Sequence, residues 1–155
     1  VALVPTGESI EDAAYEGEIS LVADSVSLIA AVGFIEDESL TVTVATENNQ
    51  SPGTGMTRIA FFQAIPSDDL YDLSANDNTL IQGVAYPSVF DGAGDGYVSV
   101  DVLAGDYEFT VEGASSFINV GNITTGSGRV YLIVSAGNED APIYFLISGN
   151  FPSSE

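Results

Sequence analysis

The sequence contains no histidine, cysteine, lysine or tryptophan, and its only positively charged side chains are Arg58 and Arg129. Without histidine and cysteine the chain has no imidazole base, no thiol nucleophile, no disulfide and no zinc site of the usual kind. A conventional serine triad lacks its base for the same reason. Acidic residues could form the carboxylate pair of a glycoside hydrolase, but no pair stands in a recognisable arrangement. We therefore expect a protein that is not an enzyme.

Acidic residues greatly outnumber basic ones. The 155 residues include 23 aspartates and glutamates, which gives a formal net charge of −21 at pH 7. A charge of this sign and size repels nucleic-acid phosphates and anionic membrane surfaces, so neither is expected as a partner. No segment approaches the roughly 20 apolar residues of a membrane-spanning helix, and membrane insertion is not expected. Because the sequence begins at Val1, we interpret it as a processed secreted or cell-surface protein, or a piece of a longer one.

Hydrophobic residues make up 45% of the chain, which is enough for a packed core despite the charge. Apolar and polar residues alternate along the segments 40–44, 98–102 and 107–112, as in half-buried strands. Glycine, asparagine, aspartate and proline punctuate these segments, and the acidic stretch 8–15 has room for one helical turn at most. The sequence predicts an all-β fold, namely an antiparallel β-sandwich of the Ig-like or Greek-key type.

Three segments are apolar at nearly every position, without alternation: 25–34, 130–134 and 143–147. Such segments suit central strands of a closed sandwich, or strands whose outer face a neighbour covers. Composition leaves both interpretations open, an ordinary core or an assembly surface. An internal repeat favours the second.

Residues 19–43 align with residues 123–147 without a gap, at a constant offset of 104. Gly33 falls on Gly137, an acidic turn follows each glycine, and each copy then has a second hydrophobic strand and a proline. Such an ordered match is typical of a structural repeat, here about 100 residues long. The chain then holds about one and a half repeats: residues 1–52 form the C-terminal half of one repeat, and residues 53–155 form a complete one.

Half of a sandwich leaves an apolar face and open strand edges, which must be covered by a neighbouring domain or subunit. Repeated units of this kind can assemble head to tail, by strand addition or by burial of apolar faces. We therefore expect copies of this chain to be its main partners. The candidate interface residues are Leu28, Ile29, Val32, Val42, Val44, Ile143, Phe145 and Ile147.

Three segments of the C-terminal part carry a family resemblance: 57–66, which begins Thr-Arg-Ile-Ala-Phe-Phe, the short segment 84–86, and 97–107, a valine-rich strand followed by Ala-Gly-Asp-Tyr. In these segments the chain resembles the bacterial domain-of-unknown-function family 4397, and residues 1–50 look like the last half of the same domain. The resemblance implies a secreted β-sandwich of bacterial surfaces, often in tandem repeats, without an established catalytic activity.

The chain departs from the family pattern at three positions. Gln63 stands where the family usually has histidine, Ser67 where it usually has aspartate, and Pro87 where it usually has glycine. A chemical role of the family's opening turn is therefore not carried over to this chain.

Two weak candidate sites remain. Asp91 and Asp95 lie in a glycine-rich segment that could hold Ca²⁺, although the EF-hand spacing is absent and a plain hairpin turn explains the same residues. No other cofactor is expected. Asn122 begins an Asn-Ile-Thr glycosylation sequon and is otherwise a turn residue.

Two functions fit these observations. The first is a non-catalytic extracellular structural protein, a repeat subunit of a surface filament or fibre. The second is an adhesin-type or carbohydrate-binding surface module, in which the seven tyrosines of the chain would stack on surface glycans. The half-repeat favours the first function, because tandem adhesin repeats would be expected to end at whole-domain boundaries.

Overall fold

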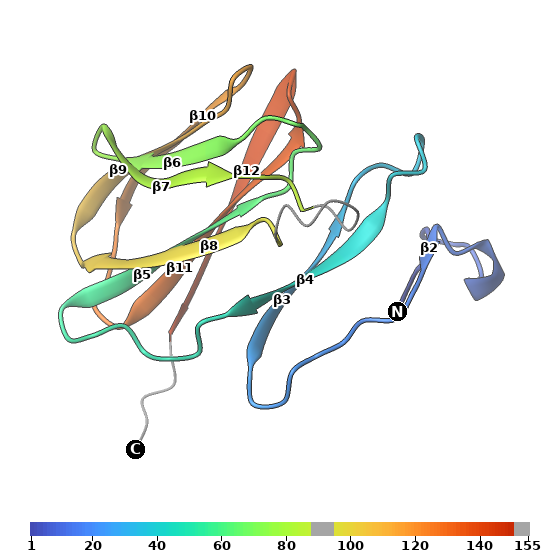
Figure 1. Ribbon diagram of the computed structural model, residues 1–155, viewed down its shortest axis with the longest axis horizontal. Coiled ribbons are helices and arrows are strands. Elements are labelled where there is room, and N and C mark those ends of the chain that lie inside the picture. Colours follow the sequence, from blue (N-terminus) through green and yellow to red (C-terminus); the bar gives the residue numbers. More distant parts are fainter. Residues whose placement is uncertain (88–94, 151–155) are drawn as a thin grey trace. The chain divides into compact units, whose positions relative to one another are not determined.

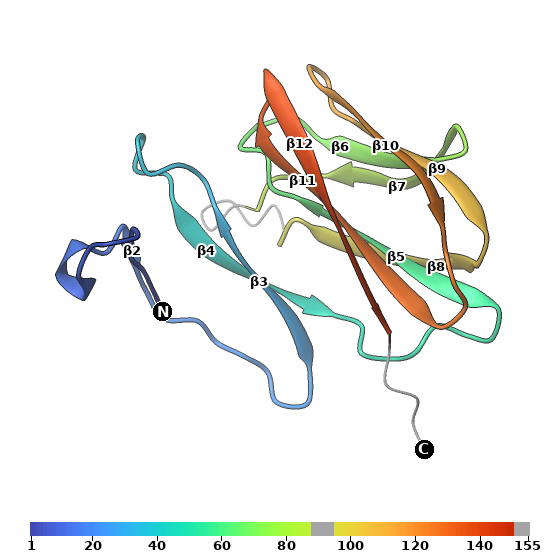
Figure 2. The ribbon, with the colours of Figure 1, turned by 180° about the vertical axis from the view of Figure 1, so that it is seen from behind.

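The computed structural model describes residues 1–87 and 95–150 (Figures 1 and 2). The chain divides into an N-terminal unit, Val1–Asn48, and a C-terminal unit, Asn49–Glu155. Both units are all-β, and the described residues contain no α-helix, only the 3₁₀ turn η1 at Ile10–Asp12. None of the helical structure in these residues is long and apolar enough to cross a membrane.

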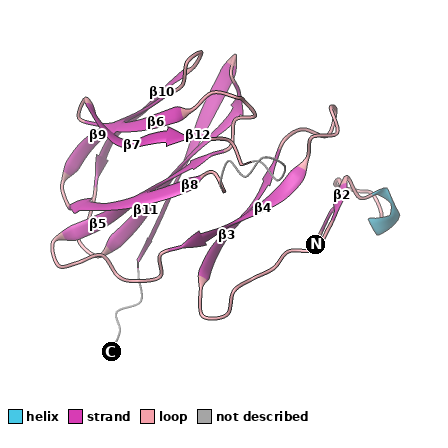
Figure 3. Cartoon of the chain, in the orientation of Figure 1, coloured by secondary structure: helices cyan, strands magenta, loops and turns pink. Residues whose placement is uncertain are grey.

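The N-terminal unit contains two separate two-stranded antiparallel sheets (Figure 3). The short strands β1 (Ala2–Leu3) and β2 (Tyr15–Glu16) form the first, and the hairpin of β3 (Val26–Val32) and β4 (Thr41–Glu47) forms the second. An isolated hairpin in water is marginally stable at best, because it has too few neighbours to bury its side chains. The N-terminal unit is therefore poor in core of its own.

The C-terminal unit contains two four-stranded sheets, with the strand orders β10-β9-β6-β7 and β12-β11-β5-β8. All neighbouring strands are antiparallel except β11 and β5, which are parallel. The strands are β5 (Met56–Gln63), β6 (Tyr71–Ala75), β7 (Asn78–Val84), β8 (Tyr97–Leu103), β9 (Asp106–Glu112), β10 (Phe117–Thr124), β11 (Arg129–Asn138) and β12 (Ala141–Asn150).

One hydrophobic core lies in the C-terminal unit, and strands of both four-stranded sheets contribute to it. Alternating side chains of β6 and β9 point into this core, as the period of two requires. Ile59 and Phe61 of β5 and Ile133 of β11 are completely buried there. Strands β5 and β11 are central in their sheet, so that their long apolar segments are covered by neighbours on both sides.

Gln63 is completely buried at the end of β5. Its Oε1 accepts hydrogen bonds from the Ile65 backbone N–H (3.0 Å) and from the Ser135 hydroxyl (2.6 Å), and its Nε2 donates to the Ile65 carbonyl (3.1 Å). A buried amide is tolerated when its polar atoms are satisfied in this way. Gln63 therefore links β5, the turn that follows it, and β11, which is a structural role.

The hairpins β3–β4 and β11–β12 share the feature that the sequence alignment emphasised. Gly33 and Gly137 both adopt positive φ angles, +92° and +88°. A Cβ atom at either position would collide with a carbonyl oxygen of the returning chain, that of Ser39 in the first hairpin and that of Ala141 in the second. Glycine is required at both positions because a side chain would be strained and would also lack space.

The register corrects one detail of the predicted repeat. Val32 pairs with Thr41, whereas Ala136, which is 104 residues after Val32, pairs with Ile143. Ile143 follows Thr41 by 102 residues, since 143 − 41 = 102. The gapless alignment therefore holds for the first strand only, and the turn between the strands is two residues longer in the N-terminal unit.

Replacing Gly137 by alanine is expected to destabilise the C-terminal unit by about 1–3 kcal/mol, because the new Cβ would lie 2.6 Å from the Ala141 carbonyl oxygen at a left-handed φ. Urea unfolding followed by circular dichroism would measure the loss. Gly105→Ala is the matched control, since a Cβ added at Gly105 would have no atoms within 4 Å and the backbone there has no positive φ. Equal stabilities of the two variants would contradict this steric explanation.

Candidate assembly surface

The edge strand β12 exposes large apolar side chains on both of its faces. Ile143, Phe145 and Ile147 share one face and are 50%, 52% and 55% exposed. Tyr144 and Leu146 share the other face, and each is 41% exposed. We call these five consecutive residues, 143–147, the β12 edge. No other strand of the chain combines an edge position with such a row in the described residues.

Residues 143–147 of the β12 edge contain no charge, no proline and no bulge, although Pro142 directly precedes them in the strand. Strand β12 pairs with β11 in one continuous register from Arg129–Asn150 to Asn138–Ala141, without a bulge. No other described strand pairs with β12. No charged residue occurs between Asp140 and the end of the strand. Because charges, bulges or a covering segment normally prevent edge-to-edge association, this strand is open to pairing with another chain.

The neighbouring strand β11 is also apolar on the outer face of the sheet, but its side chains there are largely covered. Leu132 and Val134 of β11 pair with Ile147 and Phe145, and paired residues of adjacent strands lie on the same face. This face is opposite to the core, because Tyr131 and Ile133 are the core residues of β11. Leu132 is nevertheless buried, at 8% exposed, and Val134 is half-buried, so the exposed apolar row lies on β12 itself.

The N-terminal unit exposes apolar residues on its hairpin as well. Val26 and Ile29 of β3 are 44% and 47% exposed. Among the predicted interface residues, Leu28, Val42 and Val44 are half-buried, and Val32 is buried. The eight predicted residues thus fall on two hairpins, and Val32 is the least accessible of them.

In strands β3, β4, β11 and β12 sequence reasoning missed three exposed large apolar residues: Val26, Tyr144 and Leu146. The signal for the last two was present, since the segment 143–147 is apolar at every position. A period-of-two interpretation nevertheless assigns one of its faces to a core. Only the edge position of β12 shows that both faces are accessible.

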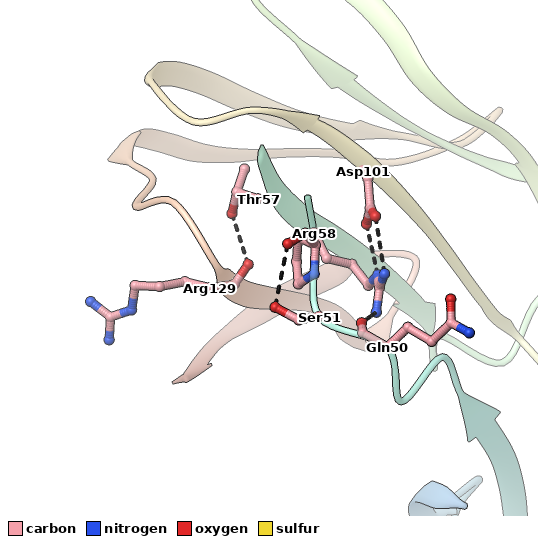
Figure 4. Close-up of polar contacts among 7 residues, drawn as sticks. Gln50, Ser51, Thr57, Arg58, Asp101 and Arg129 are labelled. Atoms are coloured by element: carbon pink, nitrogen blue, oxygen red, sulfur yellow. Dashed lines mark hydrogen bonds and ion pairs between the residues drawn. The ribbon is translucent and has the colours of Figure 1, made fainter. Parts of the chain in front are cut away.

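Arg58 forms an ion pair and hydrogen bonds inside the C-terminal unit (Figure 4). Although it is only 3% exposed, its guanidinium makes a bidentate pair with Asp101: Nε lies 2.8 Å from Oδ1 and Nη2 lies 3.0 Å from Oδ2. Nη1 donates a third hydrogen bond to the Gln50 carbonyl, at 2.7 Å. The pair joins β5 to β8 and fastens the segment that precedes β5.

Arg129, the other cation, points away from this pair (Figure 4). Its guanidinium carbon lies 5.9 Å from the centre of the Tyr131 ring, and its Nε is buried without a hydrogen-bond partner in the described part of the chain. The two arginines therefore do not form a basic patch. This charge distribution offers no anion-binding surface.

Of the two residues of the weak calcium candidate, only Asp95 lies within the described residues. Asp91 lies outside the described residues, and Asp95 accepts a hydrogen bond from the Tyr97 backbone N–H at 3.1 Å. Among residues 1–87 and 95–150 no group of three acidic side chains could hold a metal ion. Elsewhere, the pKa of the fully exposed Asp37 is held below its ordinary value by hydrogen bonds from Ser39, of which the side-chain bond has the larger effect and the backbone bond the smaller.

The prediction of Asn122 as a turn residue is wrong. Asn122 lies within β10, where it pairs with Glu108 and is exposed on the polar side of the strand. The hydroxyl of Thr124 in the same sequon donates a hydrogen bond of 2.6 Å to the Asp106 carboxylate. The sequon is therefore accessible but sits in regular sheet structure.

No family model matches the chain, and no curated protein does. The resemblance to family 4397 therefore stays a prediction.

Proposed function

We propose that this protein is a non-catalytic structural subunit that associates with copies of itself through the β12 edge. The observation that carries the proposal is the row of five exposed apolar residues, 143–147, on an edge strand that pairs with β11 on one side and with no described strand on the other. Main-chain hydrogen bonds from an added strand and burial of both faces of β12 would act together at this edge. Such pairing extends a sheet from one subunit to the next.

Charge favours a second copy at this site over other parts of the surface. The chain carries a net charge of −21, so two copies repel each other in most orientations. The segment from 141 to 150 has no charged residue, so repulsion is weakest when copies meet there. The acidic remainder would keep assembled subunits hydrated and would oppose contacts elsewhere.

The finer description of the fold belongs to the same proposal. We interpret the C-terminal unit as an antiparallel β-sandwich of the Ig-like or Greek-key type, supported by the core that both sheets share. The resemblance to family 4397 favours a secreted subunit on a bacterial surface. In this setting the assembled form would be a filament or fibre.

Replacing Phe145 by lysine is expected to abolish self-association. The ammonium group of each new lysine would be buried in the contact between two β12 edges without a partner of opposite charge. Light scattering and electron microscopy of the wild type and the variant would test this. Phe117→Lys is the matched control: Phe117 is 59% exposed and lies on the edge strand β10 of the other sheet. Circular dichroism would establish that both variants are folded.

If the Phe145→Lys variant still assembles and the Phe117→Lys variant does not, the contact lies on the sheet that contains β10, and the proposal is contradicted. A wild-type protein that stays monodisperse at its monomer mass of 16.1 kDa would remove self-association altogether. In that case the glycan-binding function would be the one to test, by titration of a glycan panel.

A further inference from the structure

The two sheets of the C-terminal unit are each built from two halves of the sequence. Strands β5 to β8, which we call the leading half, supply β6 and β7 to one sheet and β5 and β8 to the other. Strands β9 to β12, the trailing half, supply β9 and β10 to the first sheet and β11 and β12 to the second. Each sheet is therefore half leading and half trailing, so neither half can form either sheet alone.

The N-terminal unit has the layout of a trailing half. Its antiparallel pair β1–β2 precedes the hairpin β3–β4, and the two lie in separate sheets. In the same order, the pair β9–β10 precedes the hairpin β11–β12, again in separate sheets. Gly33, which directly follows β3, and Gly137, the next-to-last residue of β11, lie at the offset of 104 residues and have similar positive φ angles.

Strand β11 shows what the equivalent strand β3 lacks. The edge of β11 that faces away from β12 is occupied by β5, in parallel, with Ile133 opposite Phe61. No described strand pairs with the corresponding edge of β3, which has only β4 beside it. Ile133 is 0% exposed, whereas Ile29, its equivalent at the 104-residue offset, is 47% exposed. The difference is the burial that a β5-type strand and its sheet provide.

A second copy of residues 1–155 does not supply the missing strands. Residues 1–155 contain one leading half and two trailing halves, and the leading half is already paired with β9 and β11. Strand β5 is also central in its sheet, and Ile59 and Phe61 are completely buried. A second copy again contains one leading half for two trailing halves. Exchange of halves between copies therefore always leaves one trailing half per copy without a leading half.

We infer that the N-terminal unit is a binding surface for a leading half from outside residues 1–155, a four-stranded segment of the β5–β8 type. Its β5-type strand would lie parallel to β3, and the register of β11 with β5 transfers directly: the equivalent of Arg58 opposite Val26, and the equivalent of Phe61 opposite Ile29. Parallel strands need a covered face, which the remaining strands of the leading half provide. This contact goes beyond the proposed self-association and does not require the β12 edge.

A chain that carries a second leading half would test the inference. Val1 falls on Gly105 at the 104-residue offset, so a duplicate of residues 49–104 joined directly ahead of Val1 recreates the order of the complete repeat. Amide hydrogen exchange of β3 is expected to slow by at least about tenfold, because its free edge gains a partner strand. The matched control carries Phe61→Asp in the duplicate only, and exchange of β3 should then return to the rate of the parent chain.

Unchanged exchange of β3 in the lengthened chain, or equal slowing in the control, would overturn the inference. Aggregation of the lengthened chain without protection of β3 would count against it as well. Exchange of β11 in the parent chain reports the reference protection of a completed trailing half. Light scattering of the same samples reports self-association through β12, so failure of this inference and failure of the proposed function are separate results.

Discussion

Replacement of Asp101 by alanine is expected to lower the free energy of unfolding of the C-terminal unit by about 3 kcal/mol. The loss arises because Arg58, which is 3% exposed, keeps its positive charge when its bidentate partner is removed. The value stands at the lower end for a broken buried pair because Asp101 itself is 35% exposed, so water can partly replace it. Urea unfolding followed by far-UV circular dichroism would measure the change.

A double replacement separates the buried charge from the loss of packing. Arg58→Met together with Asp101→Leu removes both charges and keeps apolar volume, and we expect it to be more stable than Asp101→Ala alone. Asp106→Ala is the control for loss of a carboxylate, because Asp106 accepts its hydrogen bond from Thr124 at an exposed position. If Asp101→Ala unfolds at the same urea concentration as Asp106→Ala, Arg58 is not held in the way described.

The alternation of apolar and polar residues was sufficient to predict the strands that pack on one face. The predicted segments 40–44, 98–102 and 107–112 overlap β4, β8 and β9. This agreement has a physical reason, since the side-chain period of a strand is set by the backbone and does not depend on its neighbours. The all-β class, with mostly antiparallel sheets, could be predicted on this basis.

The segments 130–134 and 143–147 show where sequence reasoning stops. Both are apolar throughout, yet Ile133 in the first is completely buried, whereas Leu146, its partner on the same face in the second, is 41% exposed. The difference comes from position in the sheet: β11 has a strand on each side, and β12 has one. Composition is a property of one strand, whereas exposure depends on how many strands lie beside it.

Long-range partners were equally invisible in the sequence. The parallel pairing of β5 with β11 joins segments about 72 residues apart, as Arg58 and Val130 show. The Arg58–Asp101 pair spans 43 residues, and nothing in the local pattern of either strand marks it. The repeat was visible because it preserves local order, but the two-residue change in the turn became visible only through the register of the hairpins.

Self-association is expected to strengthen by at least about tenfold when NaCl is raised from about 10 mM to about 500 mM. The screening length falls from about 30 Å at 0.01 M salt to about 3 Å at 1 M, which weakens the repulsion between chains of net charge −21. The attraction at the β12 edge is apolar and uncharged, so salt does not weaken it. Sedimentation at several salt concentrations would measure the association constant.

The Phe145→Lys variant separates screening from specific contact, since it should remain monomeric at both salt concentrations. If the wild type and this variant associate equally at high salt, the association is general salting-out and does not use the β12 edge. Association that weakens with salt would instead indicate an ionic contact between copies. Arg129 would then be the residue to replace first, because the guanidinium of Arg58 is already paired with Asp101 inside the subunit.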